Sequence, residues 1–332
     1  MKVAVFSSKP YDREFLTAAN DNLEQPQQLI FYEAQLNLHT CILAQGCTAV
    51  CCFVNDQLNA EVLGQLAQVG VKLVALRCAG FNQVDLAAAK TLNIKIARVA
   101  EYSPHAVAEH ALGLILMLNR QLHRAYRRVH DNDYSLNGLL GFDLVKKTVG
   151  VIGTGKIGQT FARIMQGLGC EVIAYDPQPN HALAAAGITY VAPDDLWPAA
   201  DIISLHCPLN NNTHHLINPV TIAAMKDGVM LINTGRGGLI DTRAVIAGLK
   251  AKKIGYLGLD VYEEEGNLFF EDQSNNLLQD DIFARLLTFP NVVITGHQAF
   301  FTREALTSIA TITLDNIRYF EQQDFSQMTL VE

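Results

Sequence analysis

The chain has 332 residues, of which 49% are hydrophobic and 17% are charged, and its formal net charge is −8. A chain of this length can bury a large core but exceeds the size of one ordinary domain, so two domains are expected. The negative net charge gives no electrostatic footprint for nucleic acid, and we therefore exclude a nucleic-acid partner.

Short runs rich in Val and Ile alternate with helix-like stretches, a pattern typical of parallel strands joined by crossover helices. In the first hundred residues the pattern predicts strands at 2–6, 28–32, 49–54, 73–76 and 94–99 and helices at 14–20, 59–69 and 84–92. No glycine-rich phosphate loop follows any of these strands. Ser103 and Pro104 then fit the N-cap and first position of a long apolar-striped helix that reaches about Val129.

A second series of strands is predicted at 148–152, 171–175, 202–205, 229–233, 257–259 and 292–294. The amphipathic stretch 302–320 follows it and is long enough to return to the first domain. We therefore expect a discontinuous first domain, made of 1–101 and 300–332, and a second domain at 102–299.

The strand at 148–152 runs directly into Gly153-Thr154-Gly155-Lys156-Ile157-Gly158 and then into a helix, the context that a dinucleotide fingerprint requires. Gly153 and Gly155 permit a tight turn close to a pyrophosphate, and Gly158 lets the helix pack on the strand. Eighteen residues after Gly158 the next strand ends in Asp176, which is placed to bind the ribose hydroxyls and to repel a 2′-phosphate. No basic residue follows Asp176 within ten positions, so the expected cofactor is NAD rather than NADP.

Polar residues mark the points where the later strands give way to loops: His206-Cys207-Pro208, Thr234-Gly235-Arg236, Asp260 and His297. In open α/β sheets that edge is the ligand crevice. Arg236 could clamp a carboxylate, His297 could carry a proton, and Glu265 could orient the histidine. A single exposed Arg, Glu or His is usually only solvated, so the joint placement of the three carries the argument.

Several stretches together resemble the D-isomer-specific 2-hydroxyacid dehydrogenase family: Arg77-Cys78-Ala79-Gly80-Phe81-Asn82-Gln83-Val84-Asp85, Tyr102-Ser103-Pro104, the glycine loop at 153–158, and the segments 233–238, 260–265 and 296–297. The resemblance covers essentially the whole chain. It implies an α/β fold of two Rossmann-like doubly wound parallel-sheet domains, with the active site in the cleft between them. The substrate domain would be 1–101 with 300–332, and 102–299 would bind NAD.

The resemblance also implies roles for individual residues. Arg236 would bind the substrate carboxylate, His297 would be the acid/base, and Glu265 would hydrogen-bond His297. Backbone N–H groups of Cys78, Ala79 and Gly80 and the hydroxyl of Tyr102 would hold the substrate from the first domain. The cofactor would be lined by Gly153, Gly155, Lys156, Ile157, Gly158, Asp176, Cys207, Pro208, Thr213, Thr234, Gly235 and Asp260.

Within the family, the stretches 262–276 and 296–302 are most similar to bacterial fermentative enzymes, which implies NADH-dependent reduction of pyruvate to D-lactate. Phe300 and Phe301, where some relatives carry Tyr, suit a methyl-sized or somewhat larger side chain. Reduction of 2-ketobutyrate, hydroxypyruvate, glyoxylate or longer keto acids stays open, because one methylene changes binding by only about 1–3 kcal/mol. An NAD-sensing corepressor on the same fold is the alternative outside the enzymes.

The sequence also predicts where the protein is found. Charged residues at positions 9 and 12 to 14 fall where a signal peptide needs an apolar core. The longest apolar run, 111–118, is shorter than the roughly 20 residues that span a bilayer. The seven cysteines form no C-x-x-C pair and the ten histidines no H-E-x-x-H arrangement. We expect a cytoplasmic homo-oligomer, dimer or tetramer, with free thiols, no metal and no membrane partner.

Overall fold

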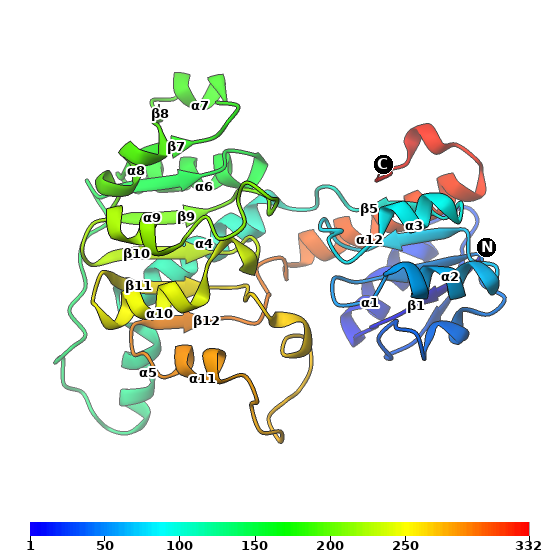
Figure 1. Ribbon diagram of the computed structural model, residues 1–332, viewed down its shortest axis with the longest axis horizontal. Coiled ribbons are helices and arrows are strands. Elements are labelled where there is room, and N and C mark those ends of the chain that lie inside the picture. Colours follow the sequence, from blue (N-terminus) through cyan, green and yellow to red (C-terminus); the bar gives the residue numbers. More distant parts are fainter. Residues whose placement is uncertain (332) are drawn as a thin grey trace. The chain divides into compact units, whose positions relative to one another are not determined.

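The computed structural model describes residues 1–331, except for the side chain of Asn267. The chain divides into two compact units. The first comprises Met1–Ser103 together with the chain from Phe301 onward, and the second is Pro104–Phe300. Each unit is built on its own parallel sheet, as the ribbon in Figure 1 shows.

The described part of the first unit holds a five-stranded parallel sheet in the order β2-β1-β3-β4-β5. Its strands are β1 (Lys2–Val5), β2 (Gln28–Phe31), β3 (Ala49–Cys52), β4 (Leu73–Leu76) and β5 (Lys95–Arg98). Its helices are α1 (Pro10–Asp21), η1 (Cys41–Ala44), α2 (Ala60–Gln68), α3 (Leu86–Thr91), α12 (Arg303–Glu321) and η4 (Phe325–Gln327).

The first sheet is buried on both faces. Helices α1 and α12 pack against each other, and α12 also lies on β4 and β5. Val3 and Val5 of β1 and Leu73 of β4 share a buried cluster with Leu314 of α12. The alternate strand residues are also buried, and the strands consequently read as continuous apolar runs, as expected for a parallel sheet covered on both sides.

The second unit holds a seven-stranded parallel sheet in the order β12-β11-β10-β9-β6-β7-β8, counted over its described residues. Its strands are β6 (Thr148–Ile152), β7 (Glu171–Tyr175), β8 (Thr189–Tyr190), β9 (Ile202–Leu205), β10 (Val229–Asn233), β11 (Ile254–Leu259) and β12 (Val292–Ile294). Its helices are α4 (Pro104–Asn119), α5 (Leu122–His130), α6 (Lys156–Gly167), α7 (His181–Ala185), α8 (Pro193–Ala199), α9 (Pro219–Ala224), η2 (Gly237–Leu239), α10 (Thr242–Lys250), η3 (Glu265–Asn267) and α11 (Asp281–Leu287).

Two separate clusters of buried side chains cover the faces of the second sheet. Helices α4 and α6 pack together over one face, whereas α8, α9 and α10 form the layer over the other. The strand order reverses between β6 and β9, because the chain runs from β6 outward through β7 to β8 and returns to β9. Such a switch point opens a crevice at the carboxyl ends of the strands, where ligands bind in this class of sheet.

The predicted fold class is confirmed, since both sheets are parallel and flanked by helices on both faces. Several details differ from the sequence-based expectation. Strand β11 begins at Ile254 rather than at residue 257, and helix α1 spans Pro10–Asp21 rather than 14–20. The helix predicted to reach Val129 breaks after Asn119, because Gln121 adopts a left-handed conformation with φ 51° and its side chain donates to the carbonyl of Leu118. The two-residue strand β8 carries no apolar run and was not predicted. Several strands end one or two residues earlier than expected, because pairing rather than hydrophobicity ends a strand.

In the described chain, no helix combines the length and apolar character needed to cross a membrane.

Candidate active site

The glycine loop after β6 has a backbone that requires glycine at two of its three glycine positions, Gly153 and Gly158. Gly153 has φ +90°, and a Cβ there would lie 2.6 Å from the amide nitrogen of Cys207. A Cβ on Gly158 would lie 1.9 Å from the carbonyl oxygen of Gly153. A Cβ on Gly155, in contrast, would meet no atom within 4 Å. The loop is thus pressed against the end of β9 while Gly155 faces open space at the N-terminus of α6, where Lys156 and Ile157 begin the helix.

Asp176 lies directly after β7 and is tied to the glycine loop. Its Oδ2 atom accepts hydrogen bonds from the backbone N of Thr154 at 2.7 Å and from the Thr154 hydroxyl at 3.2 Å. The hydroxyl of Tyr190, in β8, donates to the Thr154 hydroxyl at 2.8 Å. The carboxylate is therefore held beside the turn that would take the pyrophosphate. Thr154 and Tyr190 were missed by sequence reasoning, because their role depends on which loops meet.

The segment after β9 brings Cys207 and Pro208 to the same edge of the sheet. Burial, together with the charge of Asp176, raises the pKa of the Cys207 thiol to about 11. The hydroxyl of Thr213 donates to the carbonyl of Pro208 at 2.6 Å and accepts from the backbone N of Asn210, and these bonds close the loop 208–213. This loop is fixed by its own hydrogen bonds.

The loop after β10 is shaped by a buried amide. The Asn233 side chain accepts from the backbone N of Gly235 at 3.0 Å and donates to the carbonyl of Arg236 at 2.9 Å. Arg236 is partly exposed and its Nη1 donates to the carbonyl of Gly235 at 2.8 Å. Thr234 is 7% exposed, and its buried hydroxyl has no hydrogen-bond partner among the described residues. An orphaned polar atom at this edge fits a ligand that supplies the missing partner.

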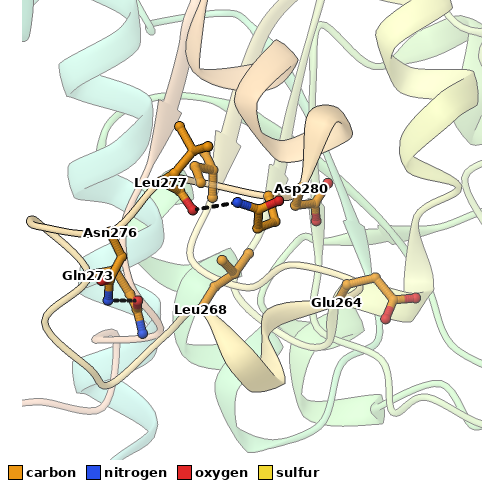
Figure 2. Close-up of a pocket in the computed structure, with 8 residues that line it drawn as sticks. Glu264, Leu268, Gln273, Asn276, Leu277 and Asp280 are labelled. Atoms are coloured by element: carbon orange, nitrogen blue, oxygen red, sulfur yellow. Dashed lines mark hydrogen bonds between the residues drawn. The ribbon is translucent and has the colours of Figure 1, made fainter.

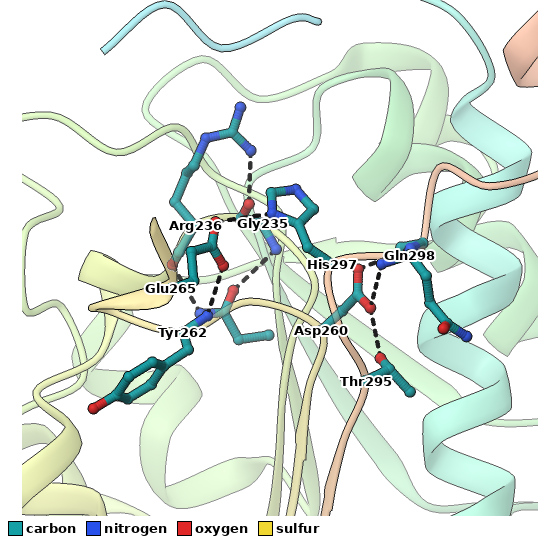
Figure 3. A network of polar contacts seen from close by, with 10 residues as sticks. Gly235, Arg236, Asp260, Tyr262, Glu265, Thr295, His297 and Gln298 are labelled. Atoms are coloured by element: carbon teal, nitrogen blue, oxygen red, sulfur yellow. Dashed lines mark hydrogen bonds and ion pairs between the residues drawn. The ribbon is translucent and has the colours of Figure 1, made fainter. Parts of the chain in front are cut away.

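His297 and Glu265 form a close pair. The Nδ1 atom of His297 lies 2.8 Å from Oε1 of Glu265, and the two side chains are 15% and 21% exposed. The other carboxylate oxygen of Glu265 accepts from the backbone N of Tyr262 at 2.9 Å. Because an ionised carboxylate only accepts hydrogen bonds, Nδ1 carries a proton, and Nε2 is the nitrogen that can exchange a proton with a substrate. In Figure 3 the imidazole of His297 and the guanidinium of Arg236 project to the same side of the polar network.

Asp260 supports the turn that carries His297. Its side chain is fully buried and accepts from the Thr295 hydroxyl at 2.5 Å and from the backbone N atoms of Gln298 and Ala299 at 2.9 and 2.8 Å (Figure 3). The backbone N of His297, which has φ +52°, donates to the carbonyl of Asp260 at 2.7 Å. Burial alone would raise the pKa of Asp260, but hydrogen bonds led by those from His110 and Thr295 outweigh it and hold the pKa below its usual range.

This network adds residues that sequence reasoning did not find. The Nε2 atom of His110, in α4, lies 3.3 Å from Oδ1 of Asp260 and 3.0 Å from the hydroxyl of Thr295. His110 and Thr295 are 185 positions apart, and no local pattern links them. Asp260, which is expected to line the cofactor, also has a structural role, because both of its carboxylate oxygens accept hydrogen bonds from within the protein.

The substrate residues expected from the first unit lie in the segment after β4. Cys78 follows Arg77, and its thiol donates to the carbonyl of Gly80 at 3.2 Å, while Arg98 donates to the carbonyl of Ala79 at 2.9 Å. The Arg77 side chain is fully buried and forms an ion pair with Asp12 at 3.0 Å. These contacts fix the 78–80 turn within its unit. Tyr102 lies in the segment between β5 and the end of the unit.

A cavity of about 510 Å³ lies between η3 and the loop that leads to α11 (Figure 2). Its lining includes Glu264, Leu268, Leu277 and Asp280. Arg236, Glu265 and His297 do not line it, so it is separate from the residues to which we assign chemistry.

The fold and this constellation define a nicotinamide-dependent oxidoreductase. A family model described as D-isomer specific 2-hydroxyacid dehydrogenase, NAD binding domain, matches residues 112–299. The chain therefore belongs to the D-isomer-specific 2-hydroxyacid dehydrogenase family, and its cofactor is NAD. The expectation of an NAD-dependent enzyme of this family is confirmed.

Particular relatives are similar over nearly their whole length. A 2-hydroxyacid dehydrogenase homolog of Haemophilus influenzae is 53% identical over 96% of this chain and 95% of its own. The D-lactate dehydrogenase of Escherichia coli is 50% identical over 100% of both chains. The solved structure of the pyruvate reductase of Chlamydomonas reinhardtii matches with a TM-score of 0.92 and 46% identity, covering 97% of both chains.

The residues present fit the cofactor. The open space beside Gly155 admits a pyrophosphate at a helix N-terminus, and the orphaned hydroxyl of Thr234 lies in the loop after β10, at the edge of the sheet where ligands bind. The Asp176 carboxylate stands where the adenosine ribose is expected.

Proposed function

We propose that this chain is a D-lactate dehydrogenase that reversibly reduces pyruvate to D-lactate with NADH. The observation that carries the proposal is the His297–Glu265 pair, held in the same polar network as Arg236 at the edge of an NAD-binding sheet (Figure 3). Similarity to the Escherichia coli D-lactate dehydrogenase over the full chain supports the choice of substrate.

In the proposed reaction, bound NADH supplies a hydride to the keto carbon of the substrate. Arg236 holds the substrate carboxylate through two parallel hydrogen bonds, which its planar guanidinium can form and a lysine cannot. Protonated His297 donates its Nε2 proton to the keto oxygen, and the negative charge of Glu265 at Nδ1 stabilises the imidazolium before transfer. In the opposite direction neutral His297 accepts the hydroxyl proton.

We propose further substrate contacts from the backbone of Cys78, Ala79 and Gly80 and from the hydroxyl of Tyr102. Phe300 and Phe301 would present an apolar surface to the substrate side chain. Phe300 is 8% exposed, and Phe301 is 48% exposed with its ring edge-on to Tyr11 at 4.8 Å between centroids. Apolar rings offer no partner for a phosphate, which argues for a small alkyl group.

The test is the initial rate of NADH oxidation with pyruvate, 2-ketobutyrate, hydroxypyruvate, glyoxylate and a longer keto acid. We expect the highest kcat/KM with pyruvate, and oxidation of D-lactate but not of L-lactate in the presence of NAD. The pH profiles of the two directions should oppose each other, because reduction needs protonated and oxidation needs neutral His297. Another keto acid with a higher kcat/KM would reassign the substrate.

Variants separate chemistry from folding. Replacement His297→Gln should lower kcat by about 10²–10⁴-fold, the usual contribution of a general acid, while NADH binding is retained. His105→Gln is the matched control, because the His105 side chain is 73% exposed on α4. If NADH binds but no keto acid is turned over, the NAD-sensing corepressor becomes the better assignment.

We also propose that the chain forms a homo-oligomer in the cytoplasm. Large apolar side chains are exposed on and after α5, with Tyr126 69%, Leu136 81% and Leu140 90% exposed. Exposed large apolar side chains can form interaction surfaces, and we propose that a second copy of the chain covers these. None of the seven cysteines forms a disulfide, which suits a reducing compartment. Sedimentation velocity tests the interface. We expect wild type to sediment as a dimer or tetramer and the double variant Leu136→Ser, Leu140→Ser as a smaller species, whereas a monomeric wild type would exclude the interface.

A further inference from the structure

Three potential metal ligands converge at a place where no metal motif is visible in the sequence. His214, His215 and Glu263 each offer one ligand atom, and these atoms all lie within 4.8 Å of one another. The Nε2 atom of His215 is 2.6 Å from Oε1 of Glu263. The histidines and the carboxylate come from the loops after β9 and β11, and 48 positions separate His215 from Glu263.

The backbone is responsible for the convergence of the two adjacent histidines. His215 has φ +50°, a left-handed conformation that is uncommon outside glycine. This conformation brings the neighbouring imidazoles into a stack with ring centroids 3.9 Å apart and an interplanar angle of 24°. The backbone N of His215 donates to the carbonyl of Gly238 at 2.8 Å, and its carbonyl accepts from Asn218 at 3.0 Å. The strained residue is thus held on both sides.

Glu263 is positioned as a ligand by its second oxygen. Its Oε2 atom accepts from the hydroxyl of Thr242 at 2.8 Å and from the backbone N of Thr242 at 3.3 Å. Thr242 is 6% exposed and is the first residue of α10, so it is fixed. The remaining oxygen, Oε1, is thereby turned toward His215. A carboxylate held in this way needs little reorganisation to bind a metal ion.

The surroundings leave room for the third ligand to adjust. His214 is exposed. A Cβ built on Gly238 would lie 3.1 Å from Cδ2 of Leu209 and 3.7 Å from Cδ2 of His214. The exposed His214 ring therefore lies near Gly238 and the Leu209 side chain and stacks on His215. Zinc bonds to imidazole nitrogen and carboxylate oxygen are about 2.0–2.2 Å long, which places neighbouring ligand atoms of a tetrahedral shell about 3.4 Å apart. Binding would therefore widen the 2.6 Å contact between His215 and Glu263 and rotate the two imidazoles out of their stack, and the exposed His214 side chain is free to make that rotation.

We propose that His214, His215 and Glu263 form a binding site for a divalent transition-metal ion, for which Zn²⁺ is the fitting probe. Two imidazoles and one carboxylate form a ligand set that zinc accepts, and water completes the tetrahedral shell. Bound metal would cross-link the loop after β9 to the loop after β11. The site contains neither Arg236 nor Glu265 nor His297, and it is independent of the proposed reaction.

A purely structural role of the His215–Glu263 contact would give a different result. The two side chains are 34% and 26% exposed, and a partly exposed ion pair of this kind contributes little to stability on its own. It would not require His214. The involvement of exposed His214 is therefore the point on which the metal site can be tested without disturbing the fold.

The experiment is isothermal titration of the NAD-free full chain with Zn²⁺, with His214→Gln as the principal variant. We expect one saturable equivalent per chain in wild type, and at least a tenfold weaker affinity in His214→Gln and in Glu263→Gln. His105→Gln should bind like wild type, because it removes an exposed histidine elsewhere. Wild-type affinity should fall as the pH is lowered, because protons compete for the imidazoles. The thermal midpoint should rise with Zn²⁺ concentration in wild type and in His105→Gln, and much less in His214→Gln and Glu263→Gln.

Three outcomes would overturn the proposal. One is a wild-type chain without saturable binding, and another is a His214→Gln variant with unchanged affinity. The third is a loss of binding in His297→Gln while His214→Gln binds normally, which would move the metal to the His297–Glu265 pair. Co²⁺ in place of Zn²⁺ checks the ligands independently, because a spectrum with intense sulfur-to-cobalt absorption would indicate Cys207 and contradict the nitrogen and oxygen set.

Discussion

The replacement Asp260→Asn tests whether the buried carboxylate of Asp260 holds the catalytic turn in place. Asparagine keeps the size of the side chain but has only one acceptor oxygen. Whichever way the amide is oriented, its NH₂ group faces the backbone N of either Gln298 or Ala299. At least one buried donor is then left without an acceptor, and the bonds that persist lose the charge of the acceptor.

The size of the effect follows from these contacts. An unsatisfied buried donor costs about 1–3 kcal/mol, and a hydrogen bond to a charged group exceeds a neutral one by about 1 kcal/mol. With one bond lost and two weakened, the free energy of unfolding should fall by about 3–5 kcal/mol. The chain should still fold, because domains are stable by about 5–15 kcal/mol. His297, whose backbone donates to Asp260, should lose its alignment, and kcat/KM for the keto acid should fall at least tenfold.

The assay combines urea unfolding with steady-state kinetics, and Asp201→Asn is the matched control. Asp201 precedes β9 and accepts from the backbone N of Thr148 at 2.9 Å and from Lys226 at 2.9 Å, so it lies at the opposite edge of the same sheet. Its replacement should lower stability without changing kcat/KM. The reasoning fails if the free energy of unfolding of Asp260→Asn lies within about 0.5 kcal/mol of the wild-type value and its kcat/KM is unchanged. A difference of that size is typical of neutral surface substitutions.

The pH dependence has a definite sign. The pKa of Asp260 is lowered in the folded chain, so the carboxylate contributes stability above its unfolded pKa, near 3.9 for aspartate, and this contribution is lost as the pH falls through the folded value. The difference in unfolding free energy between wild type and Asp260→Asn should therefore be full at neutral pH and narrow below about pH 4. A difference that stays constant into acid would show that the charge of Asp260 is not responsible.

Three further outcomes are expected. Arg236→Lys should lower kcat/KM by about 10²-fold or more, because the two parallel bonds to the carboxylate are lost, while fluorescence titration shows unchanged NADH binding. Asp176→Asn keeps an acceptor for Thr154 but removes the charge, so the NADH to NADPH ratio of kcat/KM should fall, and an unchanged ratio would exclude Asp176 as the selector. Cys207, whose thiol pKa is raised to about 11 by burial and by Asp176, should react slowly with iodoacetamide at pH 7.5. Rapid alkylation, followed by mass spectrometry, would contradict the expectation that this thiol is neutral.

Much of the fold could be predicted because its signals are local. The buried parallel strands β6, β9 and β10 are predominantly apolar, and their bounds agree with the prediction to the residue. The glycine loop is equally local, since Gly153 and Gly158 are required by contacts within a single turn and its neighbours. Strand β8 and the break at Gln121 were not predicted, because pairing and a side-chain hydrogen bond decided them.

The candidate site was also predicted only where its signals are local in the sequence. The residue types of Arg236, Glu265 and His297, and their position after successive strands, were readable from the sequence, because parallel strands bring their carboxyl ends to one edge. Which partners surround them was not, since the contacts of Asp260 with His110 and Thr295 join elements far apart in the chain.

The sequence by itself determined the α/β class, the NAD fingerprint and the residues that can do chemistry at the strand ends, because each rests on spacing within a few residues. Only the tertiary structure decided that Tyr190 supports the Asp176 loop through Thr154, that Asp260 fixes the turn of His297, and that His214 and His215 meet Glu263. Those contacts depend on which loops lie next to each other and on backbone angles such as φ +50° at His215, and neither is encoded in the local pattern of residue types.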